Sequence, residues 1–464
     1  MGDKSSPEVK ARAVWLGQEH QQDYPSVTAA ARARAKQLGL GRDRASVGGH
    51  CGRRFRRRMR RTLAAAAAAV LALSTLIPVP AQAVTYSPTA GAIFNIPDGV
   101  GGTPAQQRRW LDTVTNITDA TPAGELIIIT MLSIYDPEVI TALQRADHRG
   151  VNVQIVLSAV KVSASTAKLR DDLNDGSNPG SWFKSCRESC NGPSGIGVAH
   201  SKIFTVSNFN GPKGPIMDTT IIGTGNLTSG GSKTSFNSWH VIPNNRALYV
   251  GATNVILGMR ADVPTNLARY TVVWAGAYTL LTLPQVSSTP DPILNVLNTT
   301  QCATTRGHAG RTVIRVAQFY WSNARISIAR RLAVLKRSGC NVAVIYASID
   351  RAVLKVLLEA RIPVYDSVSH GTYNHGKTLI VSGRLGATDS DLVSQGSANW
   401  SYPNLVHNDE TVFRIRSKST TDKYRAMWTR WASWSTRTTK LPSPSTADAR
   451  AKARLLAEAM EEEG

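Results

Sequence analysis

Two stretches of the chain share one pattern, and this duplication constrains the fold more than any other feature. The first is LIIITMLSIYDPEVITALQRADHRGVNVQIVLS (126–158), and the second is IRVAQFYWSNARISIARRLAVLKRSGCNVAVIYA (314–347). Each predicts an apolar strand, a polar turn, an amphipathic helix that ends near a glycine (Gly150, Gly339), and a second apolar strand. Such strands are typical of a sheet covered on both faces. The sequence therefore predicts two similar α/β lobes, with mixed or parallel sheets flanked by helices.

A polar motif follows each repeat, at the entrance to another apolar run. AHSKIFTVSN (199–208) leads to GTGN (223–226), and NHGKTLIVSG (374–383) leads to GSANW (396–400). Residues i and i+2 of a strand share a face, so the histidine and lysine of each motif point the same way. The asparagine is expected at the end of the next strand, beside that pair. A lone histidine here is usually structural, but two copies of the same set favour a functional site between the lobes.

The recurring side chains suit a phosphate group. They are His200, Lys202 and Asn226 in the first half, and His375, Lys377 and Asn399 in the second. A cation and an amide can hold the non-bridging oxygens of a phosphate, and imidazole can act as a nucleophile or proton donor near neutral pH. Two halves facing each other would place one histidine on each side of a phosphorus atom.

The duplicated motif resembles the phospholipase D superfamily, whose signature is HxKxxxxD followed by GSxN, present twice in monomeric members. The resemblance covers about residues 90–435 and includes the aromatic helix YRAMWTRWASW (424–434). It implies a covalent phosphohistidine intermediate on His200, with His375 as the acid and then the base. It also implies a monomer that needs no metal or other cofactor.

The hydroxyl-bearing positions partly depart from the family signature. Ser207 and Ser382 stand where the family has the motif aspartate, which supports the site without taking part in the chemistry. Thr224 replaces the serine of the first GSxN motif and keeps its hydroxyl, whereas Ser397 matches the second motif. Thr224 and Ser397 are therefore expected to help bind the substrate.

A supporting carboxylate is present in only one of the two halves. Eleven residues after the motif asparagine, the family often has an acid that orients the opposed histidine. Glu410 fits this place in the second half, and we expect it to belong to the catalytic set. The first half has Asn237 there, with His240 and Asp218 as alternative partners or no such support at all.

The N-terminal region predicts export from the cell. Residues 1–83 hold 15 Lys+Arg against 5 Asp+Glu, and the rest of the chain keeps a net charge of +12. Arginines precede an apolar run that ends in Ala-Gln-Ala, as in a secretory signal peptide, and the run is short for a membrane span. We expect a signal peptide at 59–83, and residues 1–58 are an N-terminal extension that need not be translated. The protein is expected to be secreted.

The rest of the chain divides into three expected segments. The first lobe is expected at 84–290, the second at 300–435, and a flexible tail at 436–464. VSSTPDP (286–292) is the expected joint between the lobes.

Four cysteines follow the predicted signal peptide: Cys186, Cys190, Cys302 and Cys340. An even number of cysteines in an exported chain predicts disulfides, with three connectivities open. The simplest pairing is local, Cys186 with Cys190 and Cys302 with Cys340. A zinc site is the rival, but CRESC is accompanied by no second CxxC or HxxxH pattern.

The sequence predicts a secreted phosphodiesterase that hydrolyses or transfers phospholipid head groups, with a phospholipid or membrane surface as its partner. A metal-independent nuclease is the alternative, because its chemistry would be the same and a charge of +12 also suits nucleic acid. The third hypothesis is a non-catalytic relative that binds phosphate or lipid. The insertion 159–199 contains SWF (181–183), which predicts either an exposed lipid contact or a lid over the site.

Overall fold

The computed structural model describes residues 84–193, 195–263, 271–369 and 371–442, which all belong to one compact unit, Pro80–Gly464. The predicted extension and signal peptide (1–83) lie outside the described residues, as does most of the predicted tail (443–464). Within the described ranges, no helix combines the length and the apolar character that a membrane crossing requires.

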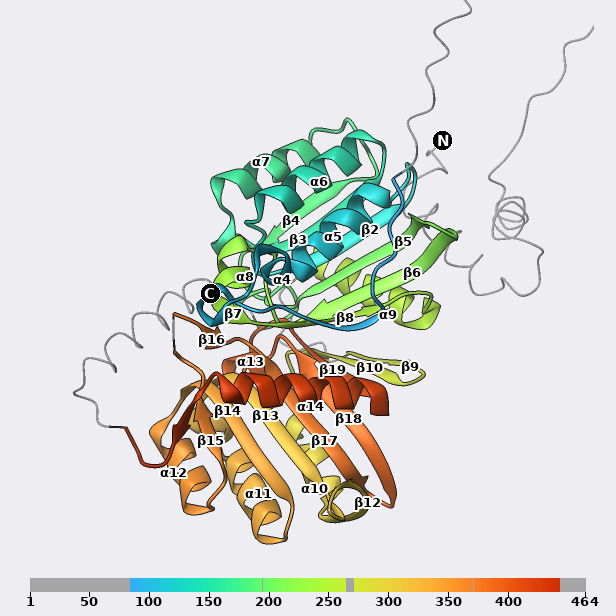
Figure 1. The fold of residues 1–464 in the computed structure, drawn as a ribbon. Coiled ribbons are helices and arrows are strands. Elements are labelled where there is room, and N and C mark those ends of the chain that lie inside the picture. Colours follow the sequence, from blue (N-terminus) through green and yellow to red (C-terminus); the bar gives the residue numbers. More distant parts are fainter. Residues whose placement is uncertain (1–83, 194, 264–270, 370, 443–464) are drawn as a thin grey trace, which may run out of the picture. The chain divides into compact units, whose positions relative to one another are not determined.

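The first half is built on a seven-stranded mixed sheet in the order β1-β8-β6-β5-β2-β3-β4 (Figure 1). Its strands are β1 (Gly91–Phe94), β2 (Leu126–Met131), β3 (Asn152–Ser158), β4 (Trp182–Cys186), β5 (Ile203–Gly211), β6 (Gly214–Gly223) and β8 (Ser238–Ile242). β2, β3 and β4 are parallel, whereas β5 pairs with β2 and β6 in antiparallel fashion. The helices are α4 (Pro104–Gln107), α5 (Arg109–Ala120), α6 (Pro137–His148), α7 (Ala164–Leu173), α8 (Ser229–Thr234) and α9 (Arg246–Arg260), with short 3-10 turns η2 (Asp98–Val100) and η3 (Ala159–Lys161).

The second half contains a ten-stranded sheet in the order β20-β15-β14-β13-β17-β18-β19-β10-β9, with β11 also paired to β17. Its strands are β9 (Thr271–Ala275), β10 (Tyr278–Leu283), β11 (Thr300–Gln301), β13 (Val313–Trp321), β14 (Asn341–Ile349), β15 (Val364–Asp366), β17 (Lys377–Leu385), β18 (Thr388–Gly396), β19 (Glu410–Arg416) and β20 (Thr436–Thr438), and β12 (Ala303–His308) lies beside β17 and β18. The helices are α10 (Pro292–Thr299), α11 (Ile326–Arg337), α12 (Arg351–Glu359), α13 (Pro403–Val406) and α14 (Lys418–Ser433), with the 3-10 turn η4 (Asn323–Arg325). The predicted pair of similar α/β lobes is confirmed.

Successive side chains of a strand point to opposite faces of its sheet, so the two faces of the first sheet belong to different apolar clusters. In β2, Ile127 and Ile129 pack with α5 and α6, whereas Ile128 between them belongs to a cluster that also contains residues of α9. The same cluster includes Ala343 and Phe413 from the second half. The inner faces of the two sheets therefore share one apolar core, which joins the two halves.

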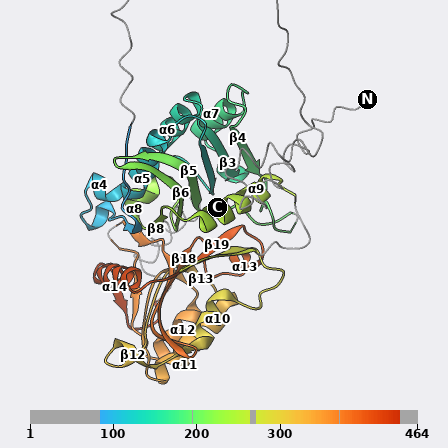
Figure 2. The ribbon, with the colours of Figure 1, turned by 90° about the vertical axis from the view of Figure 1, so that its right-hand side faces the viewer.

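Helices α9 and α14 pack in this shared core (Figures 1 and 2). α9 contacts β5 and β6 of the first sheet and β9 and β10 of the second. α14 belongs to the second half, yet its Tyr424 ring lies 4.9 Å from the Phe94 ring of β1, centroid to centroid. Each half thus contributes one helix to the packing of the other.

The chain passes from the first sheet to the second between β8 and β9, which is earlier than the joint expected at 286–292. β9 and β10 lie in the range predicted for the first lobe, but β10 pairs with β19 of the second sheet. At the other end, Thr436–Thr438 of the expected flexible tail form β20, which pairs with β15.

The segment SWF does not form an exposed lipid contact. Trp182 and Phe183 belong to β4 and are 9% and 6% exposed. Arg260 of α9 covers the Trp182 ring, with its guanidinium carbon 4.3 Å from the ring centroid. β4 is an edge strand of the first sheet, and its two aromatic residues pack in the apolar clusters on its two faces.

Candidate active site

Each His-x-Lys pair lies at the start of a strand whose neighbour ends at the motif asparagine. His200 and Lys202 precede β5, and Asn226 follows β6, which is antiparallel to β5. In the second half, Lys377 is the first residue of β17, and Asn399 follows β18. Strand pairing therefore confirms that each asparagine comes just after the strand next to that of its own pair.

Backbone contacts between the halves bring the two motifs to one junction. The short strands β7 (Ser235–Phe236) and β16 (Tyr373–Asn374) form a parallel pair that joins the halves. The His375 amide donates to the Phe236 carbonyl at 3.0 Å, and the His200 amide donates to the Asp409 carbonyl at 3.0 Å. Both histidines are thus fixed by the main chain of the opposite half.

The His200 ring is held by Glu410 of the opposite half. Its Nδ1 lies 2.8 and 2.7 Å from the two carboxylate oxygens. Both side chains are buried. A carboxylate accepts a proton donor at Nδ1, and this leaves Nε2 as the reactive nitrogen of His200. Glu410 therefore orients the histidine of the other motif, as the family pattern implied.

Several donors converge on the Glu410 carboxylate. Ser397 Oγ and Asn404 Nδ2 donate to it in short contacts, and Asn408 Nδ2 donates at 3.3 Å. Burial alone would raise the pKa of Glu410, but the His200 charge and hydrogen bond, with Lys202 and Ser397, hold its pKa below the ordinary value of 4.5. Glu410 is therefore ionised at neutral pH.

Asn237 occupies the same place in the other half. His375 Nδ1 lies 2.8 Å from Asn237 Oδ1, which also accepts from Thr224 Oγ1 at 2.9 Å. Asn237 Nδ2 donates to Ser235 Oγ at 2.8 Å, so the orientation of the amide is fixed on both sides. Since an amide oxygen only accepts, Nδ1 of His375 carries a proton, in the neutral ring as well as in the protonated one. A neutral amide thus replaces the missing acid.

The two alternative partners for His375 lie elsewhere. His240 is in β8, its ring is packed near Tyr278 and Phe413, and burial lowers its pKa to about 4. Asp218 forms an ion pair with Arg246 at 2.9 Å. Of the alternatives left open by the sequence, the residue that contacts the ring is Asn237, which stands eleven positions after Asn226 as Glu410 stands after Asn399.

The motif lysines are buried beside the histidines. Lys377 Nζ lies 2.8 Å from His375 Nε2, and Lys202 Nζ donates to the His200 carbonyl at 3.0 Å. Phe319 packs against the same group, with its ring centroid 5.1 Å from Lys377 Nζ. The lysine thus approaches the reactive nitrogen of His375 directly.

Neighbouring strands supply carboxylates where the motif aspartates are missing. Ser207 Oγ donates to Glu125 Oε2 at 2.6 Å, and Ser382 Oγ donates to Asp391 Oδ1 at 2.7 Å. Ser382 and Asp391 are directly opposite each other on β17 and β18. Each half therefore keeps an acid near this position, on a different residue.

Both predicted disulfides are present in the structure, Cys186–Cys190 and Cys302–Cys340. Among the described residues, no group of three or more His, Cys, Asp or Glu side chains is arranged to hold a metal ion.

The small disulfide loop is attached to the second half through Asp409. The Cys190 and Asn191 amides donate to its carboxylate at 2.5 and 3.2 Å, and Asn191 Nδ2 donates at 3.1 Å. Burial raises the pKa of Asp409 to about 7, against the lowering effect of these hydrogen bonds. The loop is thus held directly beside Glu410.

A pocket of about 540 Å³ opens beside His200 and Asn399. Segment 196–198, which follows the disulfide loop, forms one wall, segment 403–408 contributes to another, and Phe319 and Tyr320 complete the lining. None of the described residues that line this pocket is a lysine, an arginine or an acid. Beside the catalytic His200, its lining is made of apolar side chains, three asparagine amides, the Tyr320 side chain and the His407 ring.

The fold and the paired motifs are those of the phospholipase D superfamily. The profile of the family described as cardiolipin synthase, PLD-like domain, matches residues 115–250 and 308–431, more than half of the chain. The chain belongs to this family. No curated protein shows significant sequence similarity to it.

Several solved structures are similar to the chain at low sequence identity. Phosphatidylserine synthase from Haemophilus influenzae is 11% identical, with a TM-score of 0.51 over 77% of this chain and 92% of the synthase. Polyphosphate kinase from Porphyromonas gingivalis is 11% identical, with a TM-score of 0.47 over 80% of this chain; the match spans about half (55%) of the kinase. Nuc from Salmonella typhimurium, a phospholipase D family member, is 19% identical over 36% of this chain and 91% of Nuc, with a TM-score of 0.26.

Proposed function

We propose that the protein is a secreted phosphodiesterase that hydrolyses, or transfers to another alcohol, the head-group phosphodiester of phospholipids through a covalent phosphohistidine. One observation carries this proposal. Each histidine is held at Nδ1 by a side chain of the opposite half, Glu410 for His200 and Asn237 for His375. This arrangement reserves two Nε2 atoms for chemistry at one junction.

The reaction proceeds in two balanced steps. Nε2 of one neutral histidine attacks phosphorus, the P–O bond to the leaving alcohol breaks, and the other histidine, which starts as an imidazolium, gives that oxygen its Nε2 proton. The second histidine then removes a proton from water or an acceptor alcohol, which attacks phosphorus and breaks the N–P bond. The enzyme returns to its starting state without a redox partner or a metal-activated water.

The two ring partners favour His200 as the nucleophile. A ring phosphorylated at Nε2 that keeps its Nδ1 proton is positively charged. Glu410, a carboxylate, stabilises this charge, whereas Asn237 offers only a neutral amide oxygen. His375, whose partner offers no counter-charge, suits the role of the acid that protonates the leaving group.

The lysines and asparagines complete the site by binding the phosphate oxygens. Lys202 and Lys377 are buried, so their charges act in a medium of low dielectric, where electrostatic stabilisation of a phosphoryl group is strong. Asn226 and Asn399 can add amide donors from the two strand ends.

The pocket beside His200 favours a lipid over a nucleic acid. A polynucleotide brings further phosphates next to the scissile one, and these require lysine or arginine. The described lining has neither, and the exposed apolar side chains Ile196 and Tyr402 lie at or beside this wall. The family description, which refers to cardiolipin synthase, points to the same substrate class.

Secretion is supported by the two disulfides, which persist in oxidising compartments. N-terminal sequencing of the exported protein should find a start near Val84. A start well away from this residue would overturn the predicted cleavage site.

The deciding experiment compares two substrates side by side. The secreted form is incubated with phosphatidylcholine vesicles and with plasmid DNA, each with and without chelator. We expect release of choline, unaffected by chelator, and intact plasmid. Cleaved DNA with intact lipid would make the protein a nuclease, and no turnover of either substrate, together with phosphate or lipid binding, would make it a non-catalytic relative.

A further inference from the structure

The carbonyl of each motif asparagine accepts a hydrogen bond from a buried side chain that belongs to no motif. Arg325 Nη1 donates to the Asn399 carbonyl at 3.3 Å, and Trp110 Nε1 donates to the Asn226 carbonyl at 3.3 Å. Arg325 is 4% exposed and Trp110 is 1% exposed. The two contacts occupy equivalent places in the two halves, although arginine and tryptophan share no sequence pattern.

The backbone around these carbonyls is also equivalent. Leu227, which follows Asn226, forms a parallel bridge with Ile134, and Trp400, which follows Asn399, forms one with Trp321. The bridges leave the asparagine carbonyl itself for a side-chain donor. Without that donor, a buried carbonyl would be left unsatisfied and the turn that aims the asparagine would be free to move.

Arg325 is itself fixed by a buried carboxylate. Its Nε and Nη2 atoms donate to the two oxygens of Asp291 at 2.8 and 2.7 Å, in a two-point contact. Asp291 Oδ1 also accepts the Ile293 and Leu294 amides, which caps α10. Every bond of this cluster restrains the guanidinium, so its remaining Nη1 is held at the Asn399 carbonyl.

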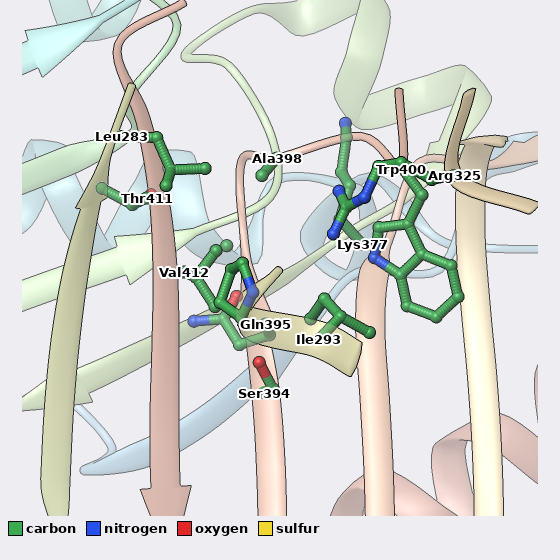
Figure 3. Close-up of a pocket in the computed structure, with 12 residues that line it drawn as sticks. Leu283, Ile293, Arg325, Lys377, Ser394, Gln395, Ala398, Trp400, Thr411 and Val412 are labelled. Carbon is green, nitrogen blue, oxygen red and sulfur yellow. The ribbon is translucent and has the colours of Figure 1, made fainter. Parts of the chain in front are cut away.

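The surroundings of Arg325 connect it to the catalytic lysine. Arg325, Trp400 and Lys377 line one small cavity of about 10 Å³ (Figure 3). The Trp321 and Trp400 rings pack edge to face, with centroids 4.6 Å apart, and Trp321 Nε1 donates to the Arg325 carbonyl at 3.2 Å. Arg325 thus lies in a closely packed layer immediately behind the active site.

We propose that Arg325 and Trp110 are positioning residues that set the orientation of Asn399 and Asn226 toward the phosphate. This inference rests on the proposed function, because it assigns the two asparagines to substrate binding. Neither residue reaches the reacting atoms; each acts through the carbonyl of one asparagine. An error of about 1 Å in a group that binds the transition state can cost roughly 100-fold in rate.

The test is a double-mutant cycle with bis(p-nitrophenyl) phosphate as the substrate. Asn399→Ala should lower kcat by about 100-fold, as expected for the loss of one donor to a developing charge. Arg325→Met alone should lower kcat by about 10- to 100-fold. In the Asn399→Ala background, Arg325→Met should cause no further loss. The cycle of Trp110→Phe with Asn226→Ala should behave in the same way.

Matched control variants separate positioning from general destabilisation. Arg331 of α11 also donates to a main-chain carbonyl of α10, that of Leu297 at 3.1 Å. Trp428 Nε1 donates to the Val316 carbonyl at 2.8 Å, within a strand. Arg331→Met and Trp428→Phe should leave kcat within about two-fold of the parent. Because loss of Arg325 leaves a buried Asp291 carboxylate unpaired, Asp291→Asn/Arg325→Met serves as a second variant; it should fold better than Arg325→Met and remain equally slow.

If the loss of kcat in a double variant equals the product of the losses in its two single variants, the proposal is wrong. The tested side chain would then act independently of its asparagine. Normal kcat in Asn399→Ala would overturn the proposed site and, with it, this role of Arg325. Crystal structures of Arg325→Met and Arg331→Met provide a readout that does not depend on turnover. The Asn399 side chain should be displaced in the first variant only, and an unmoved Asn399 would also refute the proposal.

Discussion

Asn237 and Glu410 occupy equivalent places in the two halves but differ in charge. Each stands at Nδ1 of the histidine in the opposite half, and each accepts from a motif hydroxyl, Thr224 or Ser397. One partner is a neutral amide and the other is a carboxylate with a lowered pKa. Identical backbone frames therefore hold the two rings, and the charge of the partner distinguishes their roles.

Replacing each of the two histidines by alanine should give a different kinetic defect. His200→Ala should abolish turnover, by at least about 10⁴-fold, and no covalent adduct should form. His375→Ala should block turnover of phospholipid but retain attack on a p-nitrophenyl phosphodiester, because nitrophenolate leaves without a proton. Mass spectrometry of acid-free peptide digests locates the trapped phosphohistidine. An adduct at His375 would reverse the assignment.

Glu410→Gln gives both histidines an amide partner. We expect a loss of about 10²- to 10³-fold in kcat with little change in the overall fold, because the cationic phosphohistidine loses its counter-charge. Steady-state kinetics and near-ultraviolet circular dichroism measure the two effects. An unchanged rate would show that the carboxylate only supports the structure.

Asn237→Asp makes the converse change and gives both histidines an acid. His375 should then hold its proton more firmly, and turnover of phospholipid should fall by about 10-fold. The p-nitrophenyl substrate needs no proton, so its rate should stay within about two-fold of the parent. Equal slowing of both substrates would argue that Asn237 positions the ring and has no influence on its proton.

The residue before each ring partner also differs between the halves: Phe236 precedes Asn237, and Asp409 precedes Glu410. Asp409 is expected to affect the pH dependence of stability. Its pKa is raised to about 7, so the folded state binds a proton that the unfolded chain releases near pH 4. Its contribution to stability is therefore lost as the pH rises from about 4 to about 7. Asp409→Asn should remove that part of the slope, changing the difference in Tm between pH 4 and pH 7.5 by about 5 °C. Thermal melts of both proteins at pH 4, 5.5 and 7.5 test this, and parallel curves would contradict it.

The repeats and motifs predicted the lobes, the strands and the catalytic pairs because those features are local. The strand that ends at Asn226 or Asn399 could be placed from its apolar run and glycines. Periodicity could not show that Thr271–Leu283 joins the second sheet, since pairing partners depend on how the chain returns in space. The sequence also could not decide where Trp182 packs, because an aromatic residue next to turn residues fits either an edge strand or a lid.

Sequence spacing gave the crossed histidine contacts only in part. Glu410 was assigned to the opposed histidine through the family resemblance, and Asn237 was recognised by its position but not by its role. Glu125 and Asp391 could not be foreseen as partners of Ser207 and Ser382, because they come from neighbouring strands. Arg325 had no signal at all, since its contact with Asn399 is made across 74 residues of chain.

Each histidine forms hydrogen bonds with two consecutive residues of the other half, Phe236–Asn237 for His375 and Asp409–Glu410 for His200. If two identical polypeptides built such a site, every inherited change would appear on both sides of the phosphate at once. A single gene that encodes both halves removes this constraint, because each copy can mutate alone. We therefore expect the ring partners at 237 and 410 to vary independently of each other among homologous sequences, while both histidines stay. The different roles of the two halves would then be visible as different residues at these two equivalent positions.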